Sequence, residues 1–480
     1  MRSIRLPKLY FILPFSILLL FFIYQVKGYY YTCLPAMDIA IFNEAISRFW
    51  YEGVLNPFGN VRQIKIFNDH IDPIMIIFSP IHALFKYQLV TIICIPFFAI
   101  LLAFFVLKKK YLLTGFDLFI FYTMIMFSRS VMGELSYPMH PILWSMPVLL
   151  MFVKKIMDNN IGGGFCFALF LLLFKETYAF ALFGFSFGML YFYFSHRDKR
   201  CLYYGLLSLI ISSSYLSWYF FIRPEMMGGK IYNYTGIELG HLTENGVFGF
   251  LKVWLLGFDY KTFFTTFLSY FFLFWLNRKS LKKNKNVLIL IAWVLPLFAI
   301  HLYTNYFFHW HSIPFGMLTI GIFCCLVDLT KVSLKNKVIP LLIYITFSIF
   351  LHVRAFNFVF FNKSKTCEIS PTKVQYLKQM RTFIKEQKDG TAFLMTSGMI
   401  PWTMHPRFKM HQWGEYPSNR TNFDVIIFEK TNKGVHSRNS NEAIEDASRI
   451  CQGTEVVLNN DYVFAAKGPF SPECITLRHE

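Results

Sequence analysis

The 480 residues are strongly apolar: 55% are hydrophobic, 20% are aromatic and only 16% are charged. A soluble domain carries about 25% charged residues, so this composition excludes an ordinary soluble protein and indicates a chain that lipid solvates. The formal net charge of +19 suits a nucleic-acid partner, but the basic residues fall between apolar runs, so we expect no nucleic-acid binding.

The first apolar run is Leu9–Val26, which follows the basic residues Arg2, Arg5 and Lys8. A secretory signal peptide begins in a similar way. This run is long enough to cross a membrane and shows no obvious small-residue cleavage site. It therefore predicts a retained membrane anchor.

A polar segment, Met37–Pro73, interrupts the apolar N-terminal half and fills most of the first loop, residues 28–73. We predict that the rest of the chain is a scaffold that holds this loop against a membrane-embedded cavity. Glu44 is expected on a solvated helix face. Asp72 directly precedes Pro73, which is typical of a helix cap. The loop also carries Asp38, Asp69 and His70, which are candidate site residues.

The apolar runs predict about eleven transmembrane helices. A span needs about 20 apolar residues, so the short run Ile74–Phe85, broken at Pro80, predicts a helix on the membrane surface instead. The ten spans that follow the anchor are predicted at Leu89–Leu107, Tyr111–Phe127, Ile142–Val153, Ile161–Phe174, Tyr178–Phe194, Leu202–Ile222, Thr262–Leu276, Val287–Leu302, Pro314–Val327 and Val338–His352.

The basic residues predict the orientation, because cytoplasmic loops carry the excess of Lys and Arg. Loops rich in these residues alternate with loops poor in them from end to end. The N-terminus is therefore expected in the cytoplasm and residues 356–480 on the other side. The rich loops contain Lys108–Lys110, Lys154–Lys155, Arg197–Arg200, Arg278–Lys285 and Lys331–Lys337.

Ionisable residues are predicted at membrane depth in the turn Lys175-Glu176-Thr177. The arm that leads to it, Ile161–Phe174, reaches only about 21 Å at 1.5 Å per residue, whereas the hydrocarbon core is about 30 Å thick. Ionisable residues at this depth are usually functional. Lys175 and Glu176 therefore either face a substrate or neutralise each other in a tight turn.

The C-terminal part reads as a small α/β domain, so the chain divides into a transmembrane domain, 1–355, and an extracytoplasmic domain, 356–480. A helix is predicted at Pro371–Gln387, where apolar residues recur on one face. Strands are predicted at Ala392–Thr396 and Val425–Phe428. A hairpin is predicted from Glu455–Leu458 and Tyr462–Ala465.

Four of the nine cysteines fall outside the predicted spans: Cys33, Cys367, Cys451 and Cys474. An oxidising compartment allows disulfides there. Cys451 and Cys474 bracket the predicted hairpin, so we favour this pair.

Several segments, in order, resemble a large bacterial membrane-protein family known as domain of unknown function 2079, which is grouped with the GT-C glycosyltransferases. They are MDIAIFNEAISRFW, FNDHIDPIMIIFSPIHALF, SYPMHPILW, LFKETYAF, FLMTSGMIPWTMHPRFKMHQW and FDVIIFEK. The resemblance covers most of the chain. The family often has an acidic residue after the His-Pro of the third motif, where this chain has Ile142 after His140-Pro141. Glu134, six residues before His140, is the candidate substitute.

The resemblance implies an enzyme of the bacterial inner membrane that takes its sugar from a polyprenyl-phosphate donor and acts on the extracytoplasmic face. An acidic residue of the first outer loop then serves as base or metal ligand, and the resemblance leaves open whether a divalent cation is needed. We predict Asp38 as the general base, and Asp69 and His70 as the residues that orient the acceptor or a metal. A helix cap is the alternative for Asp38.

The donor phosphate needs positive charge nearby. Lys175, Arg129 and Arg223 are the candidates on the outer side, and anchoring at the membrane interface is the alternative for each. Glu176, Glu134 and His140 complete the predicted substrate-binding set. Two other functions stay open: a transporter or flippase, which usually shows internal repeats with broken helices, and a non-catalytic assembly protein.

The alternation of basic loops makes a testable prediction about topology. A reporter fused after Glu480 should report the non-cytoplasmic side of the membrane. A cytoplasmic signal would remove one span and invert the placement of Lys175.

Overall fold

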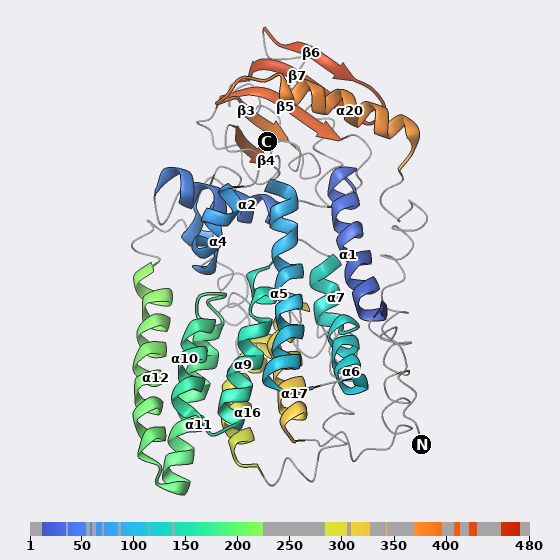
Figure 1. Cartoon of the computed structure of the whole chain (residues 1–480). Helices are drawn as coiled ribbons and strands as arrows, with labels where there is room; N and C mark the ends of the chain where they lie inside the picture. Colours follow the sequence, from blue (N-terminus) through green and yellow to red (C-terminus); the bar gives the residue numbers. More distant parts are fainter. Residues whose placement is uncertain are drawn as a thin grey trace, which may run out of the picture.

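The computed structural model describes residues 12–34, 37–53, 58–59, 64–69, 72–84, 88–113, 115–136, 140–223, 284–304, 309–326, 342, 369–395, 408–412, 422–429 and 453–470. In this part of the chain, a bundle of apolar helices carries one mixed sheet at one end (Figure 1). We call this the sheet end and the opposite end the basic end.

The bundle contains helices of very different length, and four of them are long and apolar enough to cross a membrane: Ile12–Tyr30, Thr91–Lys110, Tyr178–His196 and Lys199–Ile222. In chain order the helices are α1 (Ile12–Tyr30), α2 (Met37–Glu52), α3 (Ile66–Asp69), α4 (Ile74–Ala83), α5 (Gln88–Lys110), α6 (Gly115–Met126), α7 (Arg129–Ser136), α8 (Pro141–Trp144), α9 (Met146–Met157), α10 (Ile161–Leu171), α11 (Tyr178–His196), α12 (Lys199–Ser217), η2 (Trp218–Ile222), α16 (Asn286–Thr304) and α17 (His309–Leu326). A two-residue ladder pairs β1 (Phe58–Gly59) with β2 (Ile64–Lys65).

These helices confirm an integral membrane protein. Two predicted spans, Thr262–Leu276 and Val338–His352, lie outside the described residues apart from Leu342, and each of the others coincides with a helix. The first helix runs on to Tyr30, beyond the predicted end at Val26. The predicted surface helix at Ile74–Phe85 is observed as α4, with Ile77, Ile81 and Leu84 exposed beside its buried face.

The observed helices differ from the predicted ones in two further places. The predicted span Ile142–Val153 is divided at Ser145, whose hydroxyl donates to the carbonyl oxygen of Ile142 at 2.6 Å and ends α8. Helix α7 was not predicted, because Arg129–Ser136 has no continuous apolar run. Its apolar residues nevertheless line one face, where Val131, Met132 and Leu135 are buried.

Close helix packing in the bundle depends on small residues. Gly184 and Gly188 lie four residues apart on α11 and face α16. A Cβ atom at Gly184 would collide with the carbonyl oxygen of Ala292, and one at Gly188 would lie 2.9 Å from the Ala292 Cβ. This small-xxx-small spacing lets two backbones approach closely where lipid provides little hydrophobic driving force.

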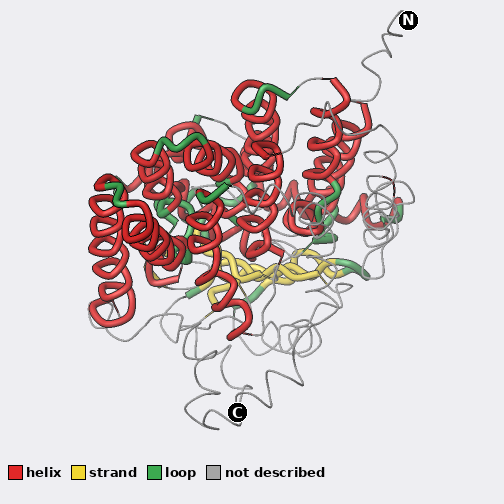
Figure 2. The backbone as a smooth tube through the Cα atoms, turned by 90° about the horizontal axis from the view of Figure 1, so that it is seen from below, coloured by secondary structure: helices red, strands yellow, loops and turns green. Residues whose placement is uncertain are grey.

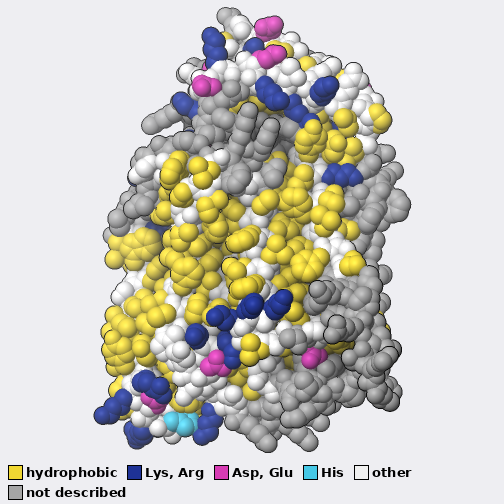
Figure 3. Space-filling model, in the orientation of Figure 1, with side chains coloured by type: hydrophobic (Ala, Val, Ile, Leu, Met, Phe, Trp, Pro, Cys, Tyr) yellow, Lys and Arg dark blue, Asp and Glu magenta, His cyan; other side chains and the backbone are white. Residues whose placement is uncertain are grey.

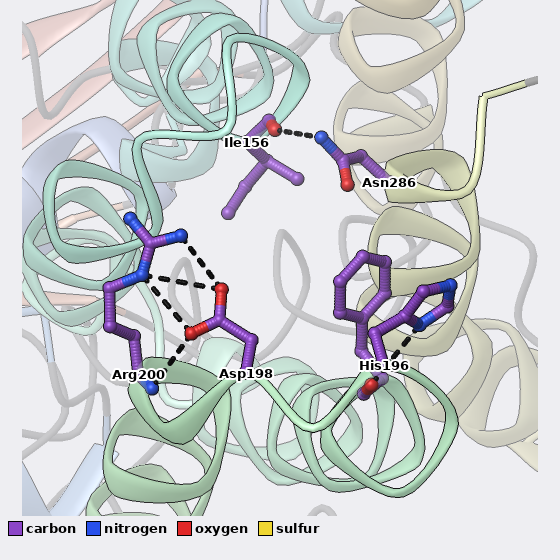
Figure 4. A network of polar contacts seen from close by, with 6 residues as sticks. Ile156, His196, Asp198, Arg200 and Asn286 are labelled. Carbon is purple, nitrogen blue, oxygen red and sulfur yellow. Dashed lines mark hydrogen bonds and ion pairs between the residues drawn. The ribbon is translucent and has the colours of Figure 1, made fainter.

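Exposed Lys and Arg side chains lie at the basic end, below a broad apolar surface, and others lie at the sheet end (Figure 3). Polar contacts tie helix ends together at the basic end (Figure 4). Asp198 caps α12 and pairs with Arg200 at 2.7 Å, and the Asn286 side chain donates to the carbonyl oxygen of Ile156 at 3.0 Å. The arrangement agrees with the basic-loop pattern of the sequence.

The sheet has five strands in the order β4-β3-β5-β7-β6, and they form a single layer (Figure 2). Strand β3 pairs in parallel with β4 and β5, whereas β7 pairs antiparallel with β5 and β6. The elements are α20 (Pro371–Lys385), β3 (Ala392–Met395), β4 (Lys409–Gln412), β5 (Phe423–Glu429), β6 (Glu455–Asn459) and β7 (Val463–Phe470). The predicted helix, strands and hairpin are confirmed, whereas β4 was not predicted.

Local sequence explains how α20 begins and where it packs. The Ser370 hydroxyl accepts from the backbone N–H of Lys373 at 3.1 Å, and Pro371 occupies the first turn, as is typical of a helix start. Leu377, Met380 and Phe383 then face the core.

The sheet domain is attached to the end of α1. Arg381 of α20 donates to the carbonyl oxygen of Tyr30 at 2.7 Å, and its guanidinium lies 3.6 Å from the centre of the Tyr30 ring. Cys33 packs against Ile369, just before α20, and is disulfide-bonded. The first loop and the sheet domain are therefore joined by charge, stacking and packing.

The disulfide of Cys33 makes a second prediction. The other described cysteines, Cys94, Cys166, Cys201, Cys324 and Cys325, are free. We expect the partner to be Cys367, since it lies two residues before Ile369 in the chain, and this leaves Cys451 for Cys474. Non-reducing peptide mapping of the mature protein should find both pairs. A free Cys33 thiol would contradict this assignment.

Candidate functional site

Helices α2 and α4 lie side by side at the sheet end and run antiparallel (Figure 1). Two buried polar contacts fix their register. The Asn43 amide oxygen lies 2.8 Å from Nε2 of His82, and the Ser79 hydroxyl donates to the carbonyl oxygen of Ile46. The first turn of α2 therefore lies far from the first turn of α4.

A group of charged side chains surrounds the start of α4; we call Asp72, Lys175, Glu176 and Arg223 the charged cluster. The Lys175 ammonium lies 3.1 Å from Oε1 of Glu176 and 3.7 Å from Oδ1 of Asp72. Asp72 is fully buried. Burial of a charge is costly unless it is paired, so these contacts explain how the cluster exists at the edge of an apolar bundle.

Backbone structure brings these residues together. The short α10 ends at Leu171, so the turn that follows carries Lys175 and Glu176 below the end of the longer helices. The backbone N–H of Ile74 donates to the carbonyl oxygen of Leu173 at 2.8 Å. This bond ties the start of α4 to the turn, as the predicted short arm requires.

Arg223 reaches the charged cluster from the end of α12. Only 2% of it is exposed. Its Nε–H donates to the carbonyl oxygen of Phe67 at 3.1 Å, and its guanidinium lies 4.8 Å from the centre of the Tyr219 ring. The last turn of α12 is a π-helix, which often marks functional sites.

Four buried polar atoms around this cluster have no hydrogen-bond partner among the described residues: Oε2 of Glu176, Oγ1 of Thr177, the Tyr215 hydroxyl and Nη2 of Arg223. Tyr215 lies within electrostatic range of both Glu176 and Asp72. An unsatisfied buried polar group costs about 1–3 kcal/mol. So many at one place indicate a site that a polar ligand or ordered water completes.

A second polar group, which we call the dyad, pairs Glu134 with His140. Nδ1 of His140 lies 3.1 Å from Oε2 of Glu134, which is buried. The His140 ring makes an edge-to-face contact with Phe42 of α2. A carboxylate beside Nδ1 fixes the imidazole tautomer and raises its basicity, as in many catalytic pairs. Glu134 thus lies beside the His-Pro motif, where the sequence placed it as a substitute.

The predicted catalytic residues divide between these two groups. Asp38 is the second residue of α2 and lies one turn before Phe42, so its backbone lies on the dyad side. Asp69 follows Phe67, which contacts Phe49 of α2. From Asp38 to Phe49 the helix rises about 16 Å. The fold therefore places Asp69 with the charged cluster and away from Asp38.

Four predicted residues lie wholly or partly beyond what the structure describes. His70 is outside the described residues, as are the side chains of Asp38, Asp69 and Arg129. Of the predicted phosphate ligands, Lys175 and Arg223 share the charged cluster.

Two structural expectations were wrong. Asp72 does not cap α4, because Pro73 occupies the cap position without a side-chain hydrogen bond and the Asp72 carboxylate faces Lys175. Glu44 is not on a solvated face, since it is only 5% exposed and pairs with Arg48 one turn later at 3.0 Å. Each of these carboxylates is paired with a basic side chain and is not exposed to solvent.

Sequence reasoning missed Thr177, Tyr215 and Tyr219. The spacing of Tyr215, Tyr219 and Arg223 by four residues places all three on one helix face. This spacing, which ends at an arginine at the end of a predicted span, is the sequence pattern that could have indicated the two tyrosines as site residues.

Tyr178 links the dyad to the charged cluster. Its hydroxyl lies 2.7 Å from Oγ of Ser145, at the end of the helix that His140 begins, and its backbone N–H donates to the carbonyl oxygen of Lys175 at 3.1 Å. Tyr178 is buried and its ring stacks on Trp293. The two polar groups are therefore held at a fixed separation.

Among the described residues, no three His, Cys, Asp or Glu side chains are grouped so that they could hold a metal ion.

One solved structure with a similar fold is ArnT from Cupriavidus metallidurans bound to undecaprenyl phosphate. The similarity covers 95% of this chain and 97% of that chain, with a TM-score of 0.55 and 11% sequence identity. At this identity the likeness shows the fold alone. No protein-family model matches the chain, and no curated protein matches it in sequence.

His82 provides a prediction that concerns the α2–α4 pair. Burial lowers the pKa of His82 to about 4, so the folded protein keeps this ring neutral while an unfolded His has a pKa near 6.5. The unfolded state therefore binds the extra proton, and the stability that the neutral ring contributes is lost as pH falls from about 6.5 towards 4.

We expect thermal unfolding of the detergent-purified protein to shift to lower temperature over this pH range. The full loss corresponds to about 3 kcal/mol below pH 4. The variant His82→Gln keeps an amide near Asn43 but does not titrate, so its unfolding temperature should depend less on pH. Equal pH dependence of the two proteins would show that His82 does not contribute.

Proposed function

We propose that this chain is a membrane glycosyltransferase that transfers a sugar from a polyprenyl-phosphate-linked donor to an extracytoplasmic lipid, glycan or protein. The observation that carries the proposal is the buried charged cluster with its unpartnered donors. It lies in a fold similar to that of ArnT, a GT-C glycosyltransferase whose structure contains undecaprenyl phosphate. The sequence motifs that resemble domain of unknown function 2079 support the same class.

Arg223 and Lys175 are the proposed ligands of the donor phosphate. Nη2 of Arg223 is buried with no partner among the described residues, so an anionic oxygen satisfies it. Lys175 already faces two carboxylates. In glycosyl transfer the phosphate leaves with the electrons of the broken bond, and fixed positive charge stabilises that developing anion. Arg129 is the third proposed phosphate ligand.

Asp38 is the proposed general base. It accepts the proton of the acceptor hydroxyl while that oxygen forms the new bond to the sugar carbon. The dyad is proposed to hold the acceptor beside it. Phe42, at the dyad, and Phe49, level with the cluster, differ by about 10 Å along α2, so the acceptor has to extend from the dyad to the sugar carbon that is bonded to the phosphate. Asp69 and His70 then orient the phosphate end or a divalent cation.

We further propose that the sheet end faces the extracytoplasmic side of a bacterial inner membrane. The exposed Lys and Arg residues at the opposite end support this orientation. The disulfide at Cys33 supports it independently, because disulfides persist in oxidising compartments.

The transporter or flippase alternative is the second candidate function. Charged residues at membrane depth suit either function. Sugar transfer by purified protein in detergent distinguishes them, because a transporter leaves the donor chemically unchanged.

Replacement of Asp38 by Asn tests the mechanism, since it removes the charge but keeps the size. A general base contributes roughly 10²–10⁴-fold, whereas a lost helix cap costs only about 1 kcal/mol. Asp38→Asn should therefore lose most transfer and still fold and insert normally. The measurement is sugar transfer from a panel of undecaprenyl-phosphate sugars, with membrane insertion checked in parallel.

Asp158→Asn is the matched control, because Asp158 pairs with Lys154 at the basic end, away from the proposed site. This variant should transfer sugar as the wild type does. Near-full transfer by Asp38→Asn would make Asp38 a structural cap and move the base to Asp69 or Glu134.

A further inference from the structure

The unpartnered atoms of the charged cluster are not all of one kind. Nη2 of Arg223 only donates hydrogen bonds, and Oε2 of Glu176 only accepts them. The hydroxyls of Thr177 and Tyr215 can do either. A ligand that completes this site must therefore present both acceptors and donors.

A phosphate alone cannot meet this requirement. The phosphodiester of a polyprenyl-phosphate sugar has no hydrogen to donate, and its negative charge is repelled by a carboxylate. Oε1 of Glu176 already faces Lys175 at 3.1 Å, so the ion pair accounts for one oxygen and leaves the other in need of a donor. Sugar hydroxyls are such donors, and in a polyprenyl-phosphate sugar they lie next to the phosphate.

We propose that Glu176, Thr177 and Tyr215 form the subsite that recognises the hydroxyl groups of the donor sugar. The proposal rests on the proposed function. Oε2 of Glu176 accepts from a sugar hydroxyl, and the Thr177 and Tyr215 hydroxyls bond its neighbours. Arg223 holds the adjacent phosphate. A site built around buried hydrogen-bonding groups discriminates strongly against ligands that lack the matching hydroxyl, because those groups are then left unpaired.

The positions of the three residues support a single subsite. Glu176 and Thr177 are consecutive in the turn before α11, and Tyr215 faces that turn from α12 within electrostatic range of Glu176. Helices α11 and α12 pack along their length, so the two sides of the subsite are held rigidly. Arg223 follows Tyr215 by eight residues, a rise of about 12 Å, and the two side chains lie within electrostatic range of each other.

The test compares two ligands on the full-length protein in detergent: undecaprenyl phosphate, and undecaprenyl-phosphate sugars from a panel of hexoses and pentoses. Affinity is measured for wild type, Glu176→Gln, Tyr215→Phe and Arg223→Gln. The matched control is Tyr203→Phe, because Tyr203 lies on the same helix but is exposed. Thermal unfolding of each variant verifies that it is folded.

Wild type should bind at least one sugar-linked lipid more tightly than undecaprenyl phosphate. Glu176→Gln should weaken that binding about 10- to 100-fold, the effect of a lost hydrogen bond to a charged group, and should leave binding of undecaprenyl phosphate unchanged or tighter. Tyr215→Phe should change in the same direction by a smaller factor. Arg223→Gln should weaken both ligands, and Tyr203→Phe neither.

Different failures have different meanings. Equal losses for both ligands in Glu176→Gln would overturn the sugar subsite but keep phosphate binding. No effect of Glu176→Gln on either ligand would mean that water fills the space, and no preference of wild type for any sugar-linked lipid also overturns the subsite. Failure of wild type to bind undecaprenyl phosphate would instead remove the proposed function itself.

Discussion

The sheet end is organised by the need to pair charges that the fold has buried. Asp72 is inaccessible and Arg223 nearly so, and each buried ion costs several kcal/mol unless a partner of opposite charge is in place. Lys175 meets Asp72 and Glu176 only because the start of α4 is bonded to the turn after the short α10. This contact depends on three features: the length of α10, the antiparallel packing of α4 on α2, and the position of the end of α12.

Helix α2 then determines what the site can do. The dyad and the charged cluster lie at different heights along the axis of α2. The hydrogen bond between Tyr178 and Ser145 also connects the elements that carry the two groups. The sheet domain lies over the same end and is held there by Arg381 on Tyr30. The exposed apolar residues of α4, Ile77 and Ile81, lie at this same end of the bundle.

The sequence predicted those features that depend on local patterning. The apolar runs located the spans, and the short run at Ile161–Phe174 predicted the end of α10 just before the turn that carries Lys175. The depth of that turn in the membrane stays a prediction. Tertiary pairing was harder to predict. Asp72 looked like a cap because Pro73 follows it, and Glu44 looked solvated because its helix is amphipathic, yet both carboxylates are held by a cation from elsewhere or one turn away. The separation of Asp38 from Asp69 follows from the direction of α4 against α2, which no local pattern encodes.

The buried polar atoms of the charged cluster that have no partner among the described residues need an energetic explanation. Its two cations and two carboxylates are already neutral as a group, so electrostatics alone does not require a ligand. A buried polar atom without any hydrogen-bond partner costs about 1–3 kcal/mol, and four atoms of this cluster have no partner among the described residues. Apolar residues of similar shape would not need such partners. Bonds to ordered water or to a ligand return that energy. Fixed donors and acceptors of this kind need not reorganise when charge develops on a bound group, which is the property that the proposed transfer reaction requires.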